Sequence, residues 1–195
     1  MIARPSKDFY GPSRTCCEMA KAVFLDADGV LWGSVSGLHP EIVRNKIIDL
    51  YLLNNDMKLV TQYVDQELKL DPKLIPVLKT LRNNGVKVAL VSNHIQECLV
   101  ALLEHFGIRQ YFDVVVTSSL VQAKKEELVP FKYAMFQLGV GKKDVIVVGD
   151  SYERDILPSR QLGIDAYLLR TDYNLNKDSN YLLSLSEITA LLGLG

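Results

Sequence analysis

The chain has 195 residues, of which 48% are hydrophobic and 23% are charged, and its formal net charge at pH 7 is -1. This length suits one domain with a modest insertion, and the near-zero charge gives no electrostatic reason to expect nucleic acid or an anionic membrane as a partner. No apolar run approaches the roughly 20 residues that span a bilayer, and residues 1–18 lack the apolar stretch of a secretory signal. The three cysteines, Cys16, Cys17 and Cys98, form a poor disulfide framework. We therefore expect unpaired thiols and a cytoplasmic protein.

The N-terminal part combines one strand with three helices. Residues 1–18 show no clear period, and we interpret them as a leader without assigned chemistry. The expected elements are then a buried parallel strand at 22–25, a helix from Pro40 to Asn54-Asn55, a weaker helix over 57–68, and a helix that starts at Asp71-Pro72 and ends at Gly85.

From residue 86 onwards, apolar and valine-rich strands alternate with helices over short connections. The expected elements are, in order, a strand at 86–91, a helix at 95–106, a strand at 114–116, a helix at 131–138, a strand at 145–148, a helix at 156–162, a strand at 166–169 and a helix at 185–192. This alternation predicts an α/β fold of three layers, a parallel sheet with helices on both faces.

One interval departs from this rhythm. The stretch between the first strand and the third helix is much longer than a direct crossover needs. We therefore expect residues 33–70 to form a small inserted α-helical cap, and residues 19–32 and 71–195 to form the core. Such a cap would lie over the carboxyl ends of the strands, where open α/β sheets bind their ligands.

Polar groups follow the first two predicted strands. Asp26 and Asp28 lie one residue apart directly after the first strand, so their carboxylates would face the same crevice. Taken alone, this pattern is also that of an acidic turn or a calcium loop. Ser92 and Asn93 follow the second strand, where a hydroxyl and backbone N–H groups at a helix start suit a phosphate oxygen. Either residue is also a common helix cap.

Charged groups follow the third and fourth predicted strands. One ammonium of Lys124-Lys125 could offset the charge of carboxylates and phosphate, or the pair could be a solvated charge cluster with the neighbouring glutamates. Asp150 leaves the fourth strand and can supply an oxygen ligand to a hard cation, and Asp155 can hold a metal-bound water. The alternative is a loop with a capping aspartate.

The order of these groups resembles the four motifs of the haloacid dehalogenase-like superfamily. In this chain they read D-x-D-G-V-L, then S-N, then Lys, then G-D-S-x-x-x-D, within the stretch 23–170. The resemblance implies a Rossmann-like sheet in which the first strand lies between the second and the fourth, so that Asp26 and Asp150 become neighbours. The spacing K-x5-F-x2-A-x4-G favours Lys125 over Lys124, although Glu126 stands where many relatives have proline.

The resemblance also implies an activity, a Mg²⁺-dependent phosphohydrolase that acts on a small phosphorylated metabolite. Asp26 would attack phosphorus and form an aspartyl-phosphate, and Asp28 would protonate the leaving group and then activate water. The other implied roles are Mg²⁺ binding by Asp26, the Asp28 backbone carbonyl and Asp150 with support from Asp155, and binding of the phosphoryl oxygens by Ser92, Asn93 and Lys125.

Two other functions remain open at this point. A phosphosugar mutase would use the same residues, and a non-catalytic phosphate-binding module could share the fold. Trp32, His39 and His94 are candidates to line the site, although Trp32 is more often a packing residue and His94 a helix-start residue. His105 is interpreted as a partner of its helix dipole. Neither the substrate nor the oligomeric state follows from the sequence.

Overall fold

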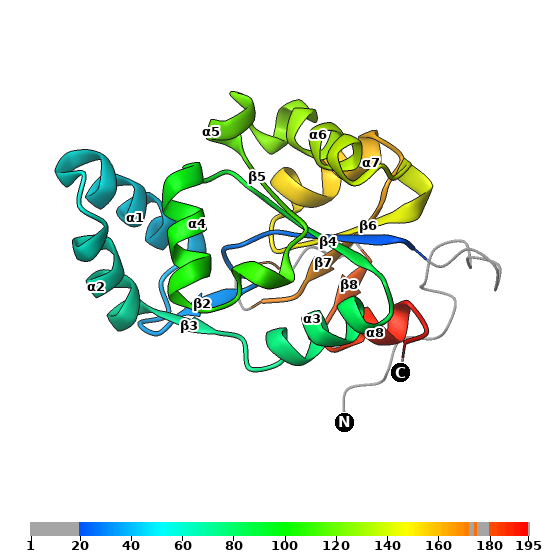
Figure 1. Ribbon diagram of the computed structural model, residues 1–195, viewed down its shortest axis with the longest axis horizontal. Coiled ribbons are helices and arrows are strands. Elements are labelled where there is room, and N and C mark those ends of the chain that lie inside the picture. Colours follow the sequence, from blue (N-terminus) through cyan, green and yellow to red (C-terminus); the bar gives the residue numbers. More distant parts are fainter. Residues whose placement is uncertain (1–19, 172–173, 175–179, 195) are drawn as a thin grey trace.

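The computed structural model describes residues 20–171, 174 and 180–194, so the predicted leader, Cys16 and Cys17 lie outside the described residues. A six-stranded sheet forms the centre, with all its strands parallel and in the order β5-β4-β1-β6-β7-β8 (Figure 1). Its strands are β1 (Ala22–Leu25), β4 (Lys87–Ser92), β5 (Val114–Thr117), β6 (Val145–Gly149), β7 (Asp165–Leu169) and β8 (Tyr181–Leu182). β1 lies between β4 and β6, which confirms the strand order implied by the resemblance.

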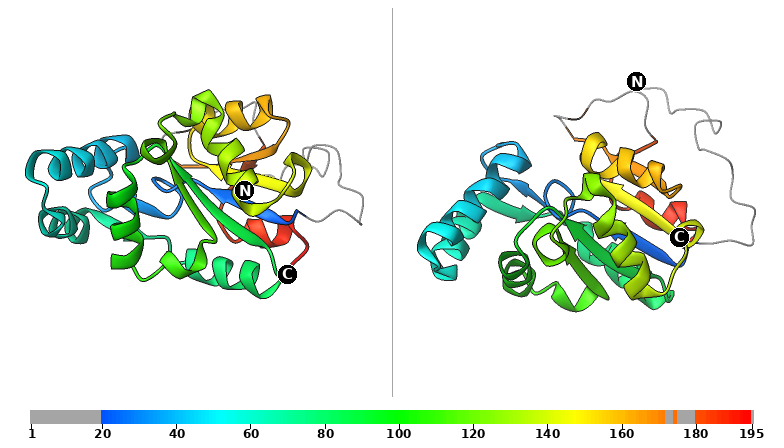
Figure 2. Two further views of the ribbon diagram at one scale, coloured as in Figure 1. Left: turned by 45° about the horizontal axis from the view of Figure 1, so that its top comes forward. Right: turned by 90° about the horizontal axis from the view of Figure 1, so that it is seen from above.

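Helices cover both faces of the sheet, which confirms the predicted α/β fold (Figure 2). Along β1, Val23 and Leu25 belong to one buried cluster, whereas Ala22 and Phe24 belong to another. Successive side chains of a strand point to opposite faces, so the two clusters are the two faces of the sheet. The first cluster is covered by α3 (Leu74–Asn83), α4 (Gln96–His105) and α8 (Glu187–Leu191), and the second by α6 (Val129–Leu138) and α7 (Leu157–Gln161).

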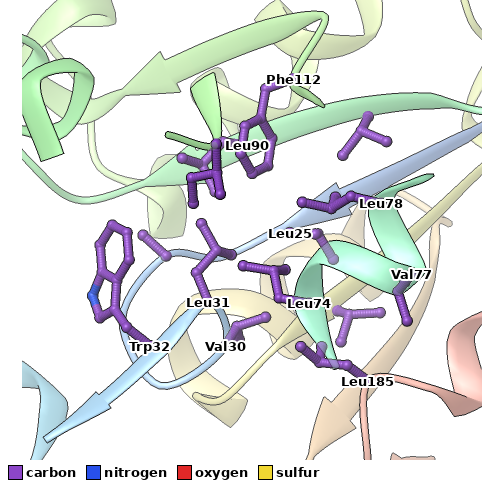
Figure 3. Packing of buried hydrophobic residues seen from close by; sticks show 14 of the residues in the cluster. Leu25, Val30, Leu31, Trp32, Leu74, Val77, Leu78, Leu90, Phe112 and Leu185 are labelled. Atoms are coloured by element: carbon purple, nitrogen blue, oxygen red, sulfur yellow. The ribbon is translucent and has the colours of Figure 1, made fainter. Parts of the chain in front are cut away.

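The packing of the first cluster fixes the end of β1 (Figure 3). Leu25 and Leu90 lie on the strands, Leu74 and Leu78 lie on α3, and Leu31 follows the turn after β1. None of these five side chains is more than 1% exposed. Each fully buried leucine contributes roughly 1.5–3 kcal/mol relative to an exposed one. The backbone on both sides of Asp26 is therefore held by apolar packing.

Residues 33–70 contain α1 (Pro40–Asn54) and α2 (Met57–Glu67), which pack together beyond the carboxyl end of the sheet (Figure 1). A two-stranded antiparallel sheet of β2 (Trp32–Ser34) and β3 (Leu68–Leu70), which the sequence did not predict, joins this segment to the core. We call residues 33–70 the helical segment. Its description as a separate cap stays a prediction.

The helical segment shares its interior with the core. Four of its buried side chains belong to the same apolar cluster as Val23 and Leu25 of β1. They are Val43, Ile47, Val60 and Val64. On its outer side, His105 lies in the last turn of α4 as predicted, and its Nε2 is also 2.6 Å from Asp65 Oδ1 of α2. The segment is thus attached by apolar packing inside and by an exposed pair outside.

The predicted helix at 156–162 is confirmed as α7 (Leu157–Gln161), but the sequence did not predict the helical turn before it. A π-helical turn over Tyr152–Ile156 comes first, and α7 follows it. Pro158 in the first turn of α7 explains the difference, because its ring would clash with the carbonyl four residues earlier in a continuous α-helix. The backbone N–H of Leu157 bonds instead to the carbonyl of Tyr152, five residues back.

Other differences concern element ends and short elements. The third helix begins at Leu74 rather than at Asp71, whose Oδ1 accepts the N–H of Lys73 at 2.7 Å and so caps the preceding turn. The last helix covers only Glu187–Leu191. α5 (Ser118–Val121) and β8 were not predicted, because four and two residues are too short to show a period. Within the described part of the chain, none of the helices combines the length and the apolar character needed to cross a bilayer.

Candidate active site

Three of the predicted residues meet because they follow adjacent central strands. Asp26 leaves β1, Ser92 ends β4, and Asp150 follows β6. The backbone N–H of Asp26 bonds to the carbonyl of Val148 at 3.0 Å, so the ladder between β1 and β6 extends as far as the first aspartate. All three residues are at most 6% exposed. The carboxyl edge of the sheet therefore carries a buried polar cluster.

Lys125 enters this cluster from the loop after β5. Its Nζ is 2.7 Å from Asp26 Oδ1 and 2.5 Å from Asp155 Oδ1, and its side chain is 1% exposed. Burial alone would lower the pKa of Lys125, but the charges of Asp155 and Asp26 outweigh it and raise that pKa above its ordinary value. Lys124 is exposed. The structure thus brings Lys125, rather than Lys124, to the aspartates.

The carboxylates of Asp26, Asp150 and Asp155 offer oxygen atoms that all lie within 4.8 Å of one another. Burial, followed by the charges of Asp26 and Asp155, raises the pKa of Asp150 to about 8. Asp150 Oδ1 is enclosed and has no hydrogen-bond partner among the described residues. An unpaired oxygen in a cluster of mutually repelling carboxylates is the setting in which a hard cation binds. The residues present therefore fit Mg²⁺.

Two glycines allow this close approach. A Cβ atom on Gly29, which has φ +78°, would lie 2.2 Å from Asp150 Oδ2, and one on Gly149 would lie 2.2 Å from Asp155 Cγ. No other residue type fits at either place without moving an aspartate. The glycines next to the predicted motif residues thus set how tightly the carboxylates gather.

Asp28 is positioned apart from the three clustered aspartates. Trp32 Nε1 donates a hydrogen bond of 2.9 Å to Asp28 Oδ1, and both side chains are buried. Burial, then the charge of Asp26, raises the pKa of Asp28 to about 6, against the opposing effects of the Trp32 bond and of Arg44. A carboxyl with this pKa can hold a proton near neutral pH and release it again. Trp32, considered above as a packing or lining residue, orients this group.

Ser92 and Asn93 differ in what their side chains do. Ser92 Oγ is buried and finds no partner in the described structure, so it is available to a ligand. Asn93 Oδ1 accepts the backbone N–H of Lys125 at 2.9 Å, and its amide donates to Glu126 Oε2 at 3.0 Å. The Asn93 side chain thus fastens the loop that carries Lys125. Glu126, at the position where many relatives have proline, holds the Asn93 side chain in place by accepting this second hydrogen bond.

Comparison with known proteins agrees with this geometry. Residues 40–169 match the family described as haloacid dehalogenase-like hydrolase. The chain belongs to that family.

Two curated relatives are enzymes. The pyrophosphatase PpaX of Halalkalibacterium halodurans is 34% identical over 122 residues, which cover 60% of this chain and 56% of that protein. The glyceraldehyde 3-phosphate phosphatase of Methanocaldococcus jannaschii is 30% identical over 143 residues, which cover 73% of this chain and 58% of that protein. The matches thus span less than two thirds of the length of either relative.

Among solved structures, the putative β-phosphoglucomutase of Thermotoga maritima matches with a TM-score of 0.71 at 22% identity, over 89% of this chain and 98% of that one. At this identity the likeness shows the fold of the haloacid dehalogenase-like hydrolases and nothing finer.

This haloacid dehalogenase-like hydrolase also has a pocket of about 470 Å³ between α1 and the core loops. Glu41 and Arg44 of α1 and Arg154 of the π-helical turn line it, and the sequence analysis gave none of them a role. The spacing from Glu41 to Arg44 predicts a local pair on a helix, but it does not indicate which face of the helix meets the core. Arg154 stands within the fourth motif, where only the aspartates were assigned.

The three other candidates to line the site have different positions. Trp32, His39 and His94 are not among the described residues that line this pocket. His39 caps α1, with Nδ1 accepting the N–H of Glu41 at 3.3 Å. His94 lies directly before the N-cap of α4, where its Nδ1 accepts the N–H of Ile95 at 2.9 Å. Burial lowers the pKa of His94 to about 4, so this ring is neutral at pH 7.

Proposed function

We propose that the protein is a Mg²⁺-dependent phosphohydrolase that acts on a small phosphomonoester through an aspartyl-phosphate on Asp26. The observation that carries this proposal is the ammonium of Lys125, which is buried and touches both Asp26 and Asp155 while Asp150 completes the carboxylate cluster. A structural ion pair has no need of a third buried carboxylate with an unpaired oxygen. A site that binds a cation and a phosphate together needs the ammonium and all three carboxylates.

The metal would be held by the carboxylates of Asp26 and Asp150 and the backbone carbonyl of Asp28, with Asp155 in support. When bound, Mg²⁺ supplies positive charge that offsets the phosphate and the carboxylates together. Lys125 would contact one phosphoryl oxygen through Nζ, and the unpartnered Ser92 Oγ would donate to another.

In the first step, an oxygen of Asp26 forms a bond to phosphorus while the bond from phosphorus to the leaving oxygen breaks. Asp28 gives its proton to that oxygen, which leaves as an alcohol. In the second step Asp28 takes a proton from water, the water oxygen bonds to phosphorus, and Asp26 is released with inorganic phosphate. The raised pKa of Asp28 supports both transfers, because one group must be acid first and base afterwards.

The test is release of phosphate from an aryl phosphate by the purified chain, with Mg²⁺ and after exhaustive chelation. We expect activity with Mg²⁺, loss on chelation, and recovery when Mg²⁺ is restored. Asp26→Asn should be inactive, whereas Asp49→Asn, an exposed change of the same chemistry on α1, should keep wild-type activity. Activity that survives chelation would overturn the metal assignment.

The same assay separates the other two functions. A mutase would convert a sugar monophosphate into an isomer with little free phosphate, and a binding module would retain phosphate without turnover. We also infer a cytoplasmic site of action, which is supported by Cys98, a buried free thiol. Cell fractionation tests that inference, and recovery in an oxidising compartment would contradict it.

A further inference from the structure

Two guanidinium groups converge on one carboxylate in the pocket between α1 and the core loops. Arg44 Nη2 is 3.0 Å from Glu41 Oε1, and Arg154 Nη1 is 2.9 Å from Glu41 Oε2. Arg44 and Glu41 belong to α1, and Arg154 belongs to the turn that also carries Asp155. All three line the pocket, whose wall also includes Asn93 and therefore borders the loop of Lys125.

The two arginines of this pocket are more buried than its carboxylates. The side chains of Arg44 and Arg154 are 11% and 17% exposed, whereas that of Glu41 is 43% exposed. The other acidic residues of the wall, Glu126 and Glu153, are exposed. The buried part of the wall thus carries the two guanidinium groups, whereas the exposed rim carries carboxylates together with the ammonium of Lys124. Charges act more strongly where water is excluded.

Arg44 also has an atom without a partner. Its Nε is enclosed and makes no hydrogen bond to any described residue. A buried donor left unpaired is unfavourable, and an acceptor on a ligand in the pocket would satisfy it. Arg154 directly precedes Asp155, so the pocket that the two arginines line borders the carboxylate cluster.

We propose that Arg44 and Arg154 form a second anion site, which binds a carboxylate or a phosphate on the leaving-group side of the substrate. This inference rests on the proposed function. The substrates are then phosphomonoesters with a second anionic group, and Glu41 holds the two guanidinium groups in place. Arginine suits this task because its planar group binds carboxylate and phosphate through paired hydrogen bonds.

The test uses four phosphomonoesters with the same three-carbon chain and different far ends. They are 3-hydroxypropyl phosphate, 3-phosphonooxypropanoate, propane-1,3-diol bisphosphate and 3-aminopropyl phosphate. For the wild-type chain with Mg²⁺, we expect kcat/KM for one or both anionic members to exceed that of the hydroxyl member by at least about tenfold, and the amine to be the poorest. The kcat/KM values of 3-phosphonooxypropanoate and propane-1,3-diol bisphosphate then show whether the second site prefers a carboxylate or a phosphate.

Variants assign the preference to residues. Arg44→Gln and Arg154→Gln should each bring the ratio of anionic to neutral substrate to within about threefold, mainly through KM. Arg44→Lys keeps the charge but loses the paired hydrogen bonds, so its ratio of anionic to neutral substrate should lie between those of the wild type and Arg44→Gln. Lys46→Gln removes the same charge from the exposed side of α1 and should leave the ratio unchanged.

Two results would overturn the second anion site while leaving the proposed function in place. One is equal kcat/KM for the neutral and anionic members with phosphate released from both. The other is an equal fall for all substrates in Arg44→Gln, which would assign Arg44 to the transferred phosphate. Absence of phosphate release from every substrate, including an aryl phosphate, would instead refute the proposed function, and the second site with it.

Discussion

The carboxyl edge of the sheet and the helical segment differ in how exposed their paired carboxylates are. At the sheet edge, Lys125 and its two aspartate partners are at most 7% exposed. In the helical segment, Asp65 and Glu41, which pair with core residues, are 61% and 43% exposed. Breaking a buried pair leaves an uncompensated charge, whereas an exposed pair is screened by water and salt. Changes at the sheet edge should therefore lower turnover strongly, and changes in the helical segment should mainly alter which substrate is accepted.

The two adjacent lysines should differ greatly in their effect on activity. Lys125→Ala should lower kcat/KM on an aryl phosphate by roughly 10²–10³-fold, because a preorganised donor to the phosphoryl oxygens is lost. Lys124→Ala removes an exposed ammonium and should change it by less than about threefold. Steady-state kinetics on both variants gives the comparison, and circular dichroism shows whether each is folded. Should Lys125→Ala fail to fold, Lys125→Met keeps the volume. Equal losses would mean that the wrong lysine has been assigned.

A smaller loss is expected from one methyl group beside the aspartates. Gly149→Ala places a Cβ within 2.2 Å of Asp155 Cγ, so Asp155 or the strand end must move. A displacement near 1 Å at a reaction centre can cost about 10²-fold in rate, and we expect the apparent affinity for Mg²⁺ to fall as well. Gly33→Ala in β2 meets nothing within 4 Å and is the matched control. If Gly149→Ala titrates with Mg²⁺ like the wild type, the close approach has no role in activity.

Removal of the helical segment should act on selectivity more than on turnover. Ser34 and Leu68 are antiparallel partners, so an Asn-Gly turn can replace residues 35–67 and join β2 to β3. We expect a lower melting temperature, because Val43 and Val60 leave the shared cluster, but a single cooperative transition. Aryl phosphate hydrolysis should persist within about tenfold, and the preference for anionic substrates should disappear. A transition without cooperativity would show that the segment belongs to the core.

The smallest effect on activity is expected from His94. Its pKa is 6.5 in the unfolded chain and about 4 in the fold, so between these values the unfolded chain binds more protons. Stability should therefore fall as the pH falls from 6.5 towards 4, by up to about 3 kcal/mol. His94→Asn should lack this component and keep its activity at pH 7.5 within about threefold. Urea unfolding at several pH values measures the difference between the two proteins. Parallel pH dependence in the wild type and His94→Asn would show that His94 is not responsible.

Elements with a clear apolar pattern in the sequence were predictable, and elements too short to show such a pattern were not. The valine-rich strands and the polar residues directly after them placed Asp26 and Asp150 at one edge, because parallel strands end on the same side. β2 and β3, with three residues each, are too short to show alternation. Arg44 was missed for a different reason. Its exposure to the pocket depends on how α1 docks, which no local spacing reports.

The central claim is that Asp26 carries the phosphoryl group, and the most direct measurement is to trap that adduct. The chain is mixed with an aryl phosphate and Mg²⁺, quenched in acid within one turnover, digested and analysed by mass spectrometry. We predict a phosphate adduct on Asp26. It should accumulate in Asp28→Asn, where water is no longer activated although an activated aryl leaving group still departs. It should be absent in Asp26→Asn. An adduct on Asp28, or turnover by Asp26→Asn, would contradict the account.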